Sequence, residues 1–316
     1  MYKDKNVLLI AGGGTLGTYT AKELLRLGAN VDIICLEDNE SYDERLTFYK
    51  SYATDAFLKE LFSKKHYDGI VNFIHYPNAE EYNSVHKLLT DNTEHLIFLS
   101  SYRVYADLEH PITEESPRLL DTMDDKEFLA NETYALSKAK AENFIINESN
   151  TTNWTIIRPV ISFSDKRFDI VTINKRFVIE YKNAGKTMFL PQRAKNCTAG
   201  LDWAGNTGKL IANILFKKNA LGQTFTITSA PNLTWGEIAE MYEELVGTKF
   251  EWIDTDEWLS EPEYIKNDYW AAVYDRFYDR VIDNSKVLEV TGLTGDDFLS
   301  IKEGIEIELK NIDESF

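Results

Sequence analysis

A tyrosine and a lysine four residues apart, Tyr134 and Lys138, are the side chains of this sequence best suited to catalysis. On a helix, residues at this spacing lie on one face, so the phenol and the ammonium are neighbours. A phenol with a pKa of about 10 is a weak base at neutral pH, and a nearby cation lowers that pKa. Such a tyrosine can exchange a proton with an alcohol or carbonyl while a hydride moves to or from a nicotinamide. A surface Tyr/Lys pair, which contributes only a few tenths of a kcal/mol, is the alternative.

Two serine hydroxyls follow an apolar segment that is predicted to be a strand. Residues 96–99 are mainly apolar, and Ser100 and Ser101 come directly after them. Ligands of open α/β sheets bind at the carboxyl ends of the strands, where a hydroxyl can hydrogen-bond the reacting oxygen. A strand-ending turn or local cap is the alternative. We expect the catalytic residues to be Ser101, Tyr134 and Lys138.

A glycine-rich segment, Ala-Gly-Gly-Gly-Thr-Leu-Gly at residues 11–17, stands between a predicted strand (7–11) and a predicted helix (19–27). A dinucleotide pyrophosphate binds at such a position, against backbone N–H groups and the positive end of the helix dipole. Glycine allows the phosphate to approach without a clash with Cβ. An ordinary tight turn is the alternative. The loop residues expected to bind the cofactor are Gly12, Gly14, Thr15, Leu16 and Gly17.

The end of the second predicted strand should choose between NAD and NADP. The strand ends at Cys35, and Glu37 and Asp38 follow closely without an Arg or Lys. Acidic groups accept hydrogen bonds from ribose hydroxyls and repel a 2′-phosphate, so NAD is favoured. His75, at the end of the fourth predicted strand, either contacts the nicotinamide or has a structural or solvent role. The further residues expected at the cofactor are Glu37, Ile74, His75, Tyr134, Lys138 and Pro159.

The first 160 residues alternate short apolar runs with helix-like stretches. Apolar strands without strict alternation, separated by helices, are typical of a parallel sheet covered on both faces. The fold class is therefore α/β, a doubly wound parallel sheet with a smaller C-terminal lobe. Strands are predicted at 7–11, 31–35, 46–49, 69–74, 96–99 and 154–157, and helices at 19–27 (ended by Gly28), 57–65, 82–89 and 134–147.

The pattern loosens after Pro159. A helix is predicted over 201–216, a strand over 224–228, and a helix over 234–246 with a capping box of Thr234 and Glu237. We expect residues 1–160 to form the dinucleotide-binding domain, with 199–229 returning to it. Residues 161–198 and 230–316 would form the substrate lobe. The aromatic residues between 250 and 280, such as Trp258, Tyr264 and Trp270, are expected to pack this lobe or an oligomer contact rather than stack on a base.

The bulk composition excludes several classes of protein. The 316 residues carry 34 basic and 52 acidic side chains, a net charge of −18, which disfavours binding to nucleic acid. No apolar run approaches the roughly 20 residues of a membrane span, and no signal peptide is recognised. Cys35 and Cys197 are far apart, and the five histidines show no metal-ligand spacing, so we expect a cytoplasmic protein without a metal.

Several short segments together resemble the extended short-chain dehydrogenase/reductase family, also called the NAD-dependent epimerase/dehydratase family. They are the loop from Gly12 to Gly17 and segments 68–75, 100–105, 112–115, 134–138, 157–159, 201–204 and 303–305. The resemblance implies a Rossmann-like domain, a C-terminal substrate lobe and, often, a homodimer. It also implies that Tyr134 acts as acid/base, that Lys138 tunes it and holds the nicotinamide ribose, and that Ser101 assists.

Departures from the family pattern narrow the chemistry. Ala11 replaces the first loop glycine, Cys35 the ribose-binding acid, and Tyr52 the acid expected near the adenine. The 4,6-dehydratase branch has an Asp-Glu pair directly after the catalytic hydroxyl residue, whereas this chain has Tyr102 and Arg103, which argues against a dehydratase.

Basic residues of the later segments are candidates for a diphosphate clamp, although most are expected to be solvated. The candidates are Arg103, Arg158, Lys166, Arg167, Lys175, Arg176, Arg193 and Lys195. The residues expected to contact the substrate are Tyr102, Arg103 and Arg193.

Two functions follow from these features. The favoured one is an NAD-dependent epimerase or carbonyl reductase acting on a sugar nucleotide or similar polyol. The alternative is a non-catalytic, Rossmann-type dinucleotide-sensing or scaffold protein, which the altered adenosine positions favour. The Tyr134–Lys138 pair and Ser101 count against that alternative, because a pure sensor does not need them.

Overall fold

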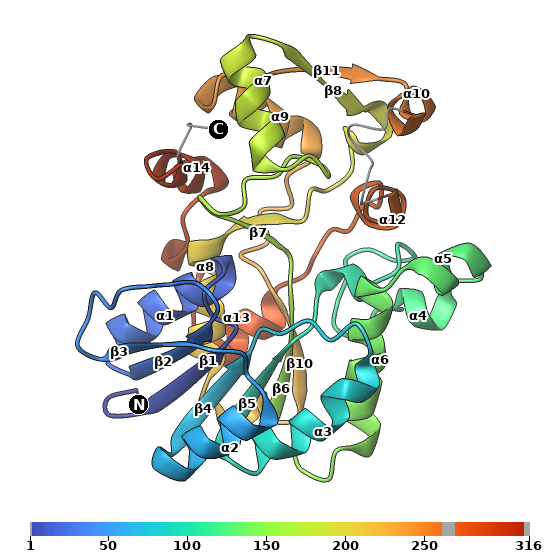
Figure 1. Ribbon diagram of the computed structural model, residues 1–316. Coiled ribbons are helices and arrows are strands. Elements are labelled where there is room, and N and C mark those ends of the chain that lie inside the picture. Colours follow the sequence, from blue (N-terminus) through green and yellow to red (C-terminus); the bar gives the residue numbers. More distant parts are fainter. Residues whose placement is uncertain (1, 261–268, 313–316) are drawn as a thin grey trace.

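The protein is built on a seven-stranded parallel sheet (Figure 1). The computed structural model describes residues 2–260 and 269–312. The strands lie in the order β10-β6-β5-β4-β1-β2-β3, and each neighbouring pair is parallel. Their bounds are β1 (Asn6–Ile10), β2 (Asn30–Cys35), β3 (Leu46–Lys50), β4 (Tyr67–Asn72), β5 (Thr93–Leu99), β6 (Trp154–Pro159) and β10 (Gln223–Ile227). This sheet confirms the predicted Rossmann-like α/β class.

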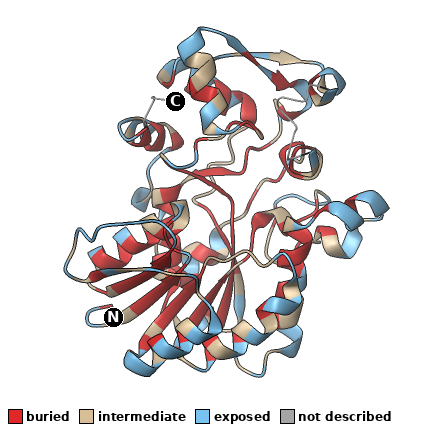
Figure 2. Cartoon of the chain, viewed as in Figure 1, coloured by how far each residue is buried: buried red, intermediate tan, exposed pale blue. Residues whose placement is uncertain are grey.

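Helices cover both faces of the sheet, because successive strand residues point to opposite sides. In β1, Val7 and Leu9 belong to one core, and Leu8 and Ile10 belong to the other. The first core is covered by α1 (Thr15–Leu27), α8 (Ala204–Ile214) and α13 (Ser285–Thr291), and the second by α2 (Asp55–Lys64), α3 (Ala79–Thr90) and α6 (Tyr134–Glu148). Figure 2 shows the sheet largely buried between these layers. Within the described ranges, no helix has the length and apolar character needed to cross a membrane.

A smaller lobe lies beyond the carboxyl ends of the strands, at the top of Figure 1. Two parallel strand pairs, β7 with β9 and β8 with β11, help to build it. Its elements are β7 (Ile161–Phe163), α7 (Lys175–Ala184), β8 (Thr187–Pro191), η2 (Gln192–Ala194), β9 (Leu201–Trp203), α9 (Trp235–Leu245), β11 (Lys249–Ile253), α10 (Thr255–Ser260), α12 (Tyr269–Ala271), the π-helical turn η4 (Ala272–Arg276) and α14 (Ile301–Leu309). The short helix η5 (Gly295–Asp297) lies beside α1 and α8. The remaining short helices are η1 (Tyr102–Val104), α4 (Leu119–Thr122), α5 (Lys126–Asn131) and η3 (Lys218–Ala220).

Aromatic side chains form much of the lobe core. Trp258 is fully buried there, and Trp252 packs against the same cluster. Trp270 and Tyr274 instead pack on Phe128 of α5. The aromatic group predicted between 250 and 280 therefore serves packing where it is described; Tyr264 lies outside the described residues.

Several predicted helices start elsewhere in the structure: α2 begins at Asp55 rather than residue 57, and α3 at Ala79 rather than residue 82. The first helix begins at Thr15 rather than residue 19, because the chain turns into it directly after Gly14. The predicted helix over 201–216 is wrong at its start, since Leu201–Trp203 forms β9. Buried Asp202 fixes this junction, because its carboxylate accepts hydrogen bonds from the backbone of Trp203 and Ser229. The predicted cap at Gly28 and the capping box of Thr234 and Glu237 are both confirmed.

Candidate active site

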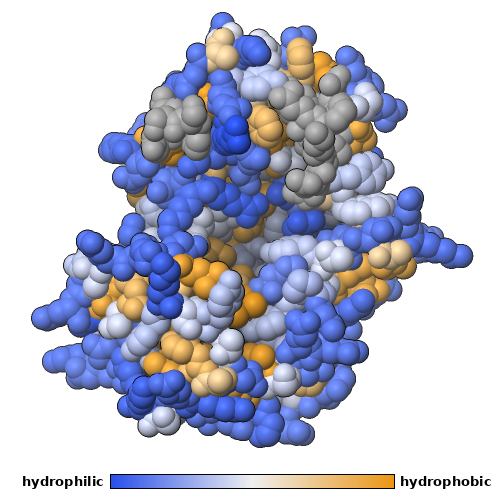
Figure 3. All heavy atoms as spheres, in the orientation of Figure 1, coloured by the Kyte–Doolittle hydropathy of each residue, from blue (hydrophilic) through white to orange (hydrophobic). Residues whose placement is uncertain are grey.

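A cavity of about 420 Å³ lies between the carboxyl ends of the sheet and the C-terminal lobe. Figure 3 shows the molecular surface hollowed in this region. The glycine loop, the ends of β5 and β6, the start of α6 and lobe residues form its walls. The sequence-predicted residues that line it are Gly14, Thr15, Leu16, Gly17, Ser101, Tyr102, Arg103, Tyr134 and Pro159. The fold thus brings the predicted catalytic tyrosine and serine to the same cavity as the glycine loop.

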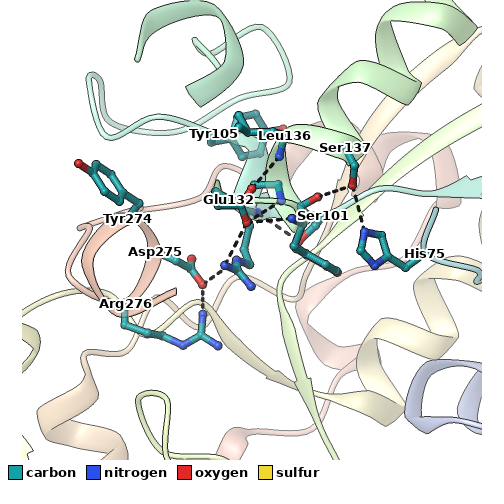
Figure 4. Close-up of polar contacts among 12 residues, drawn as sticks. His75, Ser101, Tyr105, Glu132, Leu136, Ser137, Tyr274, Asp275 and Arg276 are labelled. Atoms are coloured by element: carbon teal, nitrogen blue, oxygen red, sulfur yellow. Dashed lines mark hydrogen bonds and ion pairs between the residues drawn. The ribbon is translucent and has the colours of Figure 1, made fainter. Parts of the chain in front are cut away.

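Tyr134 is the first residue of α6, and a buried carboxylate fixes this helix start. Glu132 accepts hydrogen bonds from the backbone N–H groups of Tyr134 at 3.1 Å, Ala135 at 3.0 Å and Leu136 at 3.0 Å (Figure 4). A negative charge is favourable there because of the helix dipole. Sequence reasoning missed Glu132, although an acid two residues before a predicted helix is the available signal.

The ring of Tyr134 is held between an imidazole and a guanidinium. Its centroid is 4.9 Å from that of His75 and 4.9 Å from Arg103 Cζ. His75 Nε2 is 3.0 Å from Ser137 Oγ, which orients the imidazole. Burial and then the charge of Lys138 lower the pKa of His75 below its usual value, which favours the neutral ring. His75 thus contacts the predicted catalytic tyrosine, and its contact with a nicotinamide stays a prediction.

Lys138 lies one turn further along α6 and is buried. Its Nζ donates to the carbonyl oxygens of Leu99 at 2.5 Å and Ile74 at 3.3 Å. Leu99 is the last residue of β5, and Ile74 follows the end of β4. Burial lowers the pKa of Lys138 to about 7, and Glu142 one turn further along opposes this shift. The amine is therefore poised between its charged and neutral forms near neutral pH.

Beneath Lys138, Glu142 forms a buried ion pair with two arginines. Its carboxylate accepts from Arg158 at 2.8 Å through both Nε and Nη2, and from Arg118 at 3.1 Å. Burial alone would raise the pKa of Glu142, but the arginines reverse this and hold it below its ordinary value. Arg158 is thus a structural residue and does not reach the cavity as a diphosphate ligand.

Ser101 ends the turn after β5 and begins η1. Its Oγ accepts a hydrogen bond from the backbone N–H of Arg103 at 3.2 Å. The local cap foreseen as an alternative therefore exists, and Ser101 also lines the cavity together with Tyr134. A hydroxyl that accepts from the backbone keeps its own proton free to donate to a ligand.

The glycine loop requires glycine for close packing at several positions. A Cβ on Gly17 would lie 2.3 Å from the carbonyl oxygen of Gly12, and a Cβ on Gly12 would lie 2.8 Å from Leu9 Cβ. At Gly14 a Cβ would meet nothing within 4 Å. Gly12 therefore supports the packing of α1 on the sheet and does not line the cavity, whereas Gly14 borders the open space at the helix N-terminus.

A second cavity of about 320 Å³ adjoins the first through Ala11 and Gly14, and it corresponds to the expected adenosine site. A Cβ on Gly13 would lie 2.7 Å from Glu37 Oε2 and 2.8 Å from Cys35 Cβ, so the Glu37 carboxylate folds back over the loop. The remaining lining includes Ile74 and Tyr52. The Glu37 carboxylate therefore lies close to Cys35 at this cavity.

Ala11 adopts a left-handed backbone conformation, with φ of 56°, at the position where the family has glycine. This conformation costs an alanine about 1–2 kcal/mol, and glycine avoids most of it at some cost in chain entropy. We therefore expect Ala11→Gly to raise the free energy of unfolding by roughly 0.5–1 kcal/mol in urea titrations. The matched control is Ala130→Gly on the exposed face of α5, which should lower it by roughly the same amount. Destabilisation by both changes would refute the strain at Ala11.

Residues of the lobe also contact the glycine loop. Lys166 Nζ donates to the carbonyl oxygen of Gly13 at 2.6 Å, and Ser164 Oγ lies 3.0 Å from Thr15 Oγ1. These contacts tie the segment that follows β7 to the N-terminus of α1.

The other basic candidates divide into two groups. Arg103 and Arg167 line the main cavity, together with Arg276, which sequence reasoning missed. The others have local partners: Lys175 donates to the carbonyl of Asp165, Arg176 pairs with Glu180, Lys195 lies 5.8 Å from the Trp252 ring, and Arg193 lies 5.5 Å from the Phe277 ring. Arg193, expected at the substrate, is not among the described residues that line the cavity.

His66, Asp68 and Glu94 form a group with metal-ligating side chains. It lies near the amino ends of β4 and β5, whereas the cavity lies at the carboxyl ends of the strands. Lys5 Nζ is 2.6 Å from Asp68 and 3.2 Å from Glu94, so a lysine already balances these acids.

Comparison with known proteins agrees with this geometry. The model of the NAD dependent epimerase/dehydratase family matches residues 8–178. The chain belongs to the NAD-dependent epimerase/dehydratase family. Among curated proteins, none matches the chain significantly.

Solved structures share the fold along almost the whole chain. An epimerase from Methanothermobacter thermautotrophicus has a TM-score of 0.71 at 15% identity, covering 98% of this chain and 92% of its own. The UDP-glucose 4-epimerase of Thermotoga maritima with UDP-glucose has a TM-score of 0.69 at 12% identity, covering 96% and 97%. WbmH of Bordetella bronchiseptica in complex with NAD⁺ has a TM-score of 0.69 at 13% identity, covering 97% and 98%.

Proposed function

We propose that this protein is an NAD-dependent epimerase or carbonyl reductase that acts on a sugar nucleotide or a similar polyol. The observation that carries the proposal is the convergence of Tyr134 and Ser101 with the N-terminus of α1 on one cavity. The solved neighbours that contain UDP-glucose or NAD⁺ support the same ligand classes.

The residues around the two adjoining cavities fit a dinucleotide. Gly14 leaves open space at the N-terminus of α1, where the pyrophosphate would meet backbone N–H groups. The Glu37 carboxylate lies over Gly13, where it would accept hydrogen bonds from ribose hydroxyls and repel a 2′-phosphate. NAD, when bound, supplies the acceptor or donor of the hydride. Ile74, His75 and Pro159 would complete the nicotinamide end.

The chain's own groups would handle the proton. Tyr134 would take the proton of the substrate hydroxyl and return it later, because its position at the start of α6 places its side chain in the cavity. Ser101 would donate a hydrogen bond to the reacting oxygen. Lys138 would hold the nicotinamide ribose and supply positive charge beside Tyr134, from a site fixed by the carbonyls of Leu99 and Ile74.

Tyr102 and Arg103 limit the reaction. Elimination of water needs an acid/base pair in addition to Tyr134, and these two positions provide none. We therefore propose simple oxidation, reduction or epimerisation at one carbon.

We further propose the division into a dinucleotide-binding domain (1–160 with 199–229) and a substrate lobe (161–198 and 230–316). The pairing of β10 with β6 and the packing of α8 in the core beside α1 support the return of 199–229. A cytoplasmic homodimer is proposed from the family resemblance and the two free cysteines.

The test is hydride transfer by the purified protein. NAD-loaded protein is mixed with a panel of nucleotide sugars, the absorbance of NADH is followed, and products are identified by NMR. We expect at least one sugar to reduce the bound NAD or to be epimerised, with NAD preferred over NADP. Tight NAD binding without turnover of any sugar would favour the dinucleotide-sensing alternative, and absence of binding would contradict both.

A further inference from the structure

Arg103 occupies an unusual place beside the proposed catalytic tyrosine. It follows Ser101 by two residues, lines the main cavity, and lies with Cζ 4.9 Å from the Tyr134 ring centroid. Its side chain is 18% exposed, so it is mostly buried but reaches the cavity. A cation in this position borders the space where the reacting carbon must lie if Tyr134 exchanges a proton with it.

The ion contacts of Arg103 are longer than those of the structural arginines. Arg103 Nη2 is 3.7 Å from Glu132 Oε1, and its Nε is 3.4 Å from Asp275 Oδ2. Arg158, by contrast, binds Glu142 at 2.8 Å through two nitrogens. Among the described residues, Arg103 Nε is buried and has no hydrogen-bond partner of good geometry. Within the described ranges Asp275 Oδ2 likewise has no hydrogen-bond partner, so the 3.4 Å contact does not close as a hydrogen bond and holds the guanidinium less firmly than the Arg158 pair is held.

The carboxylates around Arg103 also contact other groups. Glu132 accepts three backbone hydrogen bonds at the start of α6. Asp275, on the turn η4, also contacts Arg276 and Arg280, and Figure 4 shows Asp275 and Arg276 on the lobe side facing the group around Glu132. The described residues that line the cavity include three arginines, Arg103, Arg167 and Arg276, and no Asp or Glu, so its wall is basic in a protein with a net charge of −18. Such a local field attracts an anion.

We propose that Arg103 binds a carboxylate on the carbon next to the one that is oxidised, so that the substrate is an acidic sugar nucleotide of the uronate class. This inference rests on the proposed function. In a hexuronate the carboxylate is bonded to the neighbour of the hydroxyl-bearing C4, whereas the diphosphate is attached across the ring. The guanidinium of Arg103 lies over the Tyr134 ring and lines the same cavity, so it is close to the side chain that would exchange a proton with the substrate. Its planar donors match a carboxylate.

Matched pairs of nucleotide sugars test this inference. UDP-glucuronate is compared with UDP-glucose, and GDP-mannuronate with GDP-mannose, because the members of each pair differ only in carboxylate against alcohol. Binding to the NAD-loaded protein is measured by calorimetry, and reduction of NAD by absorbance. We expect the uronate of at least one pair to bind roughly 10- to 100-fold more tightly than its neutral partner, as for hydrogen bonds to a charged group.

Variants then assign the preference to Arg103. Arg103→Gln should reduce the ratio of the two dissociation constants to about one, and Arg103→Lys should retain only part of it, since lysine cannot form the paired contact. Arg176→Gln, which removes the same charge from an exposed ion pair on α7, should keep the wild-type ratio. Thermal unfolding and NAD affinity of each variant identify any loss of fold, and the lysine variant keeps the charge between Glu132 and Asp275.

The outcomes separate this inference from the proposed function. If neutral sugars reduce NAD and uronates are not preferred, or if Arg103→Gln keeps the preference, the carboxylate assignment is overturned and the hydride chemistry stands. If no sugar of either kind binds or reacts, both are overturned.

Discussion

Tyr134→Phe is expected to lower kcat by about 10²- to 10⁴-fold, the usual contribution of a general acid/base, while NAD affinity stays nearly unchanged. The phenyl ring retains the contacts with His75 and Arg103, so only the hydroxyl and its proton are lost. Single-turnover absorbance of NADH measures the chemical step, and calorimetry measures the binding of NAD.

The matched control for this variant is Tyr42→Phe, because Tyr42 is 62% exposed and is not among the residues that line either cavity. It should keep the wild-type rate. Normal turnover by the Tyr134 variant would refute the mechanism, and loss of NAD affinity would show that the change acts on the cofactor site instead of the proton.

Lys138→Met is expected to lower kcat/KM by at least about 10²-fold, because the variant cannot supply the charge or the contact to the nicotinamide ribose that we propose for Lys138. It should also change how stability depends on pH. Burial lowers the pKa of Lys138 from 10.5 to about 7. Between these values the unfolded chain binds the proton and the folded chain does not, so the wild type gains stability as the pH rises, and the methionine variant lacks this gain.

Urea titrations at several pH values measure this second effect. The free energy of unfolding of the wild type, minus that of the variant, should rise by roughly 1.4 kcal/mol per pH unit between about pH 7.5 and 9. The loss of the hydrogen bonds to Leu99 and Ile74 lowers the free energy of unfolding of the variant by an amount that does not depend on pH, so it does not affect this slope. Lys140→Met, on the exposed face of the same helix, is the control and should give a flat difference. A flat difference for Lys138→Met would mean that Lys138 keeps an ordinary pKa in the folded protein.

Local sequence signals predicted the strands of the sheet and the helix that begins with Tyr134. The strand at residues 154–157 and the helix from Tyr134 are specified by their own apolar runs and spacing, and both are found. Glu132 was missed because its role depends on the exact turn into α6, which spacing does not reveal. The strand Leu201–Trp203 was taken for helix because its pairing with Ile161–Phe163 is distant in sequence.

The same reason explains the missed charges at the cavity. Asp275 contacts Arg103, and Arg276 lines the same cavity, only because the lobe folds over the sheet. No motif in the sequence around Asp275 and Arg276 indicates these positions. Glu37 was predicted at the cofactor from its position after β2, but its place over Gly13 follows from backbone geometry. Functional residues within local motifs could be predicted from the sequence, whereas contacts between segments distant in sequence could not.

The bond from Lys166 to the Gly13 carbonyl ties the C-terminal lobe to the glycine loop, where a dinucleotide is proposed to bind. If release of a cofactor from the loop requires this contact to open, the residence time of the cofactor is tied to motion of the lobe. An epimerase recovers its NAD at the end of each cycle and tolerates a captive cofactor, whereas a reductase must exchange it every time. Slow release of this kind would favour, of the two proposed reactions, epimerisation, in which the hydride returns to the molecule that gave it.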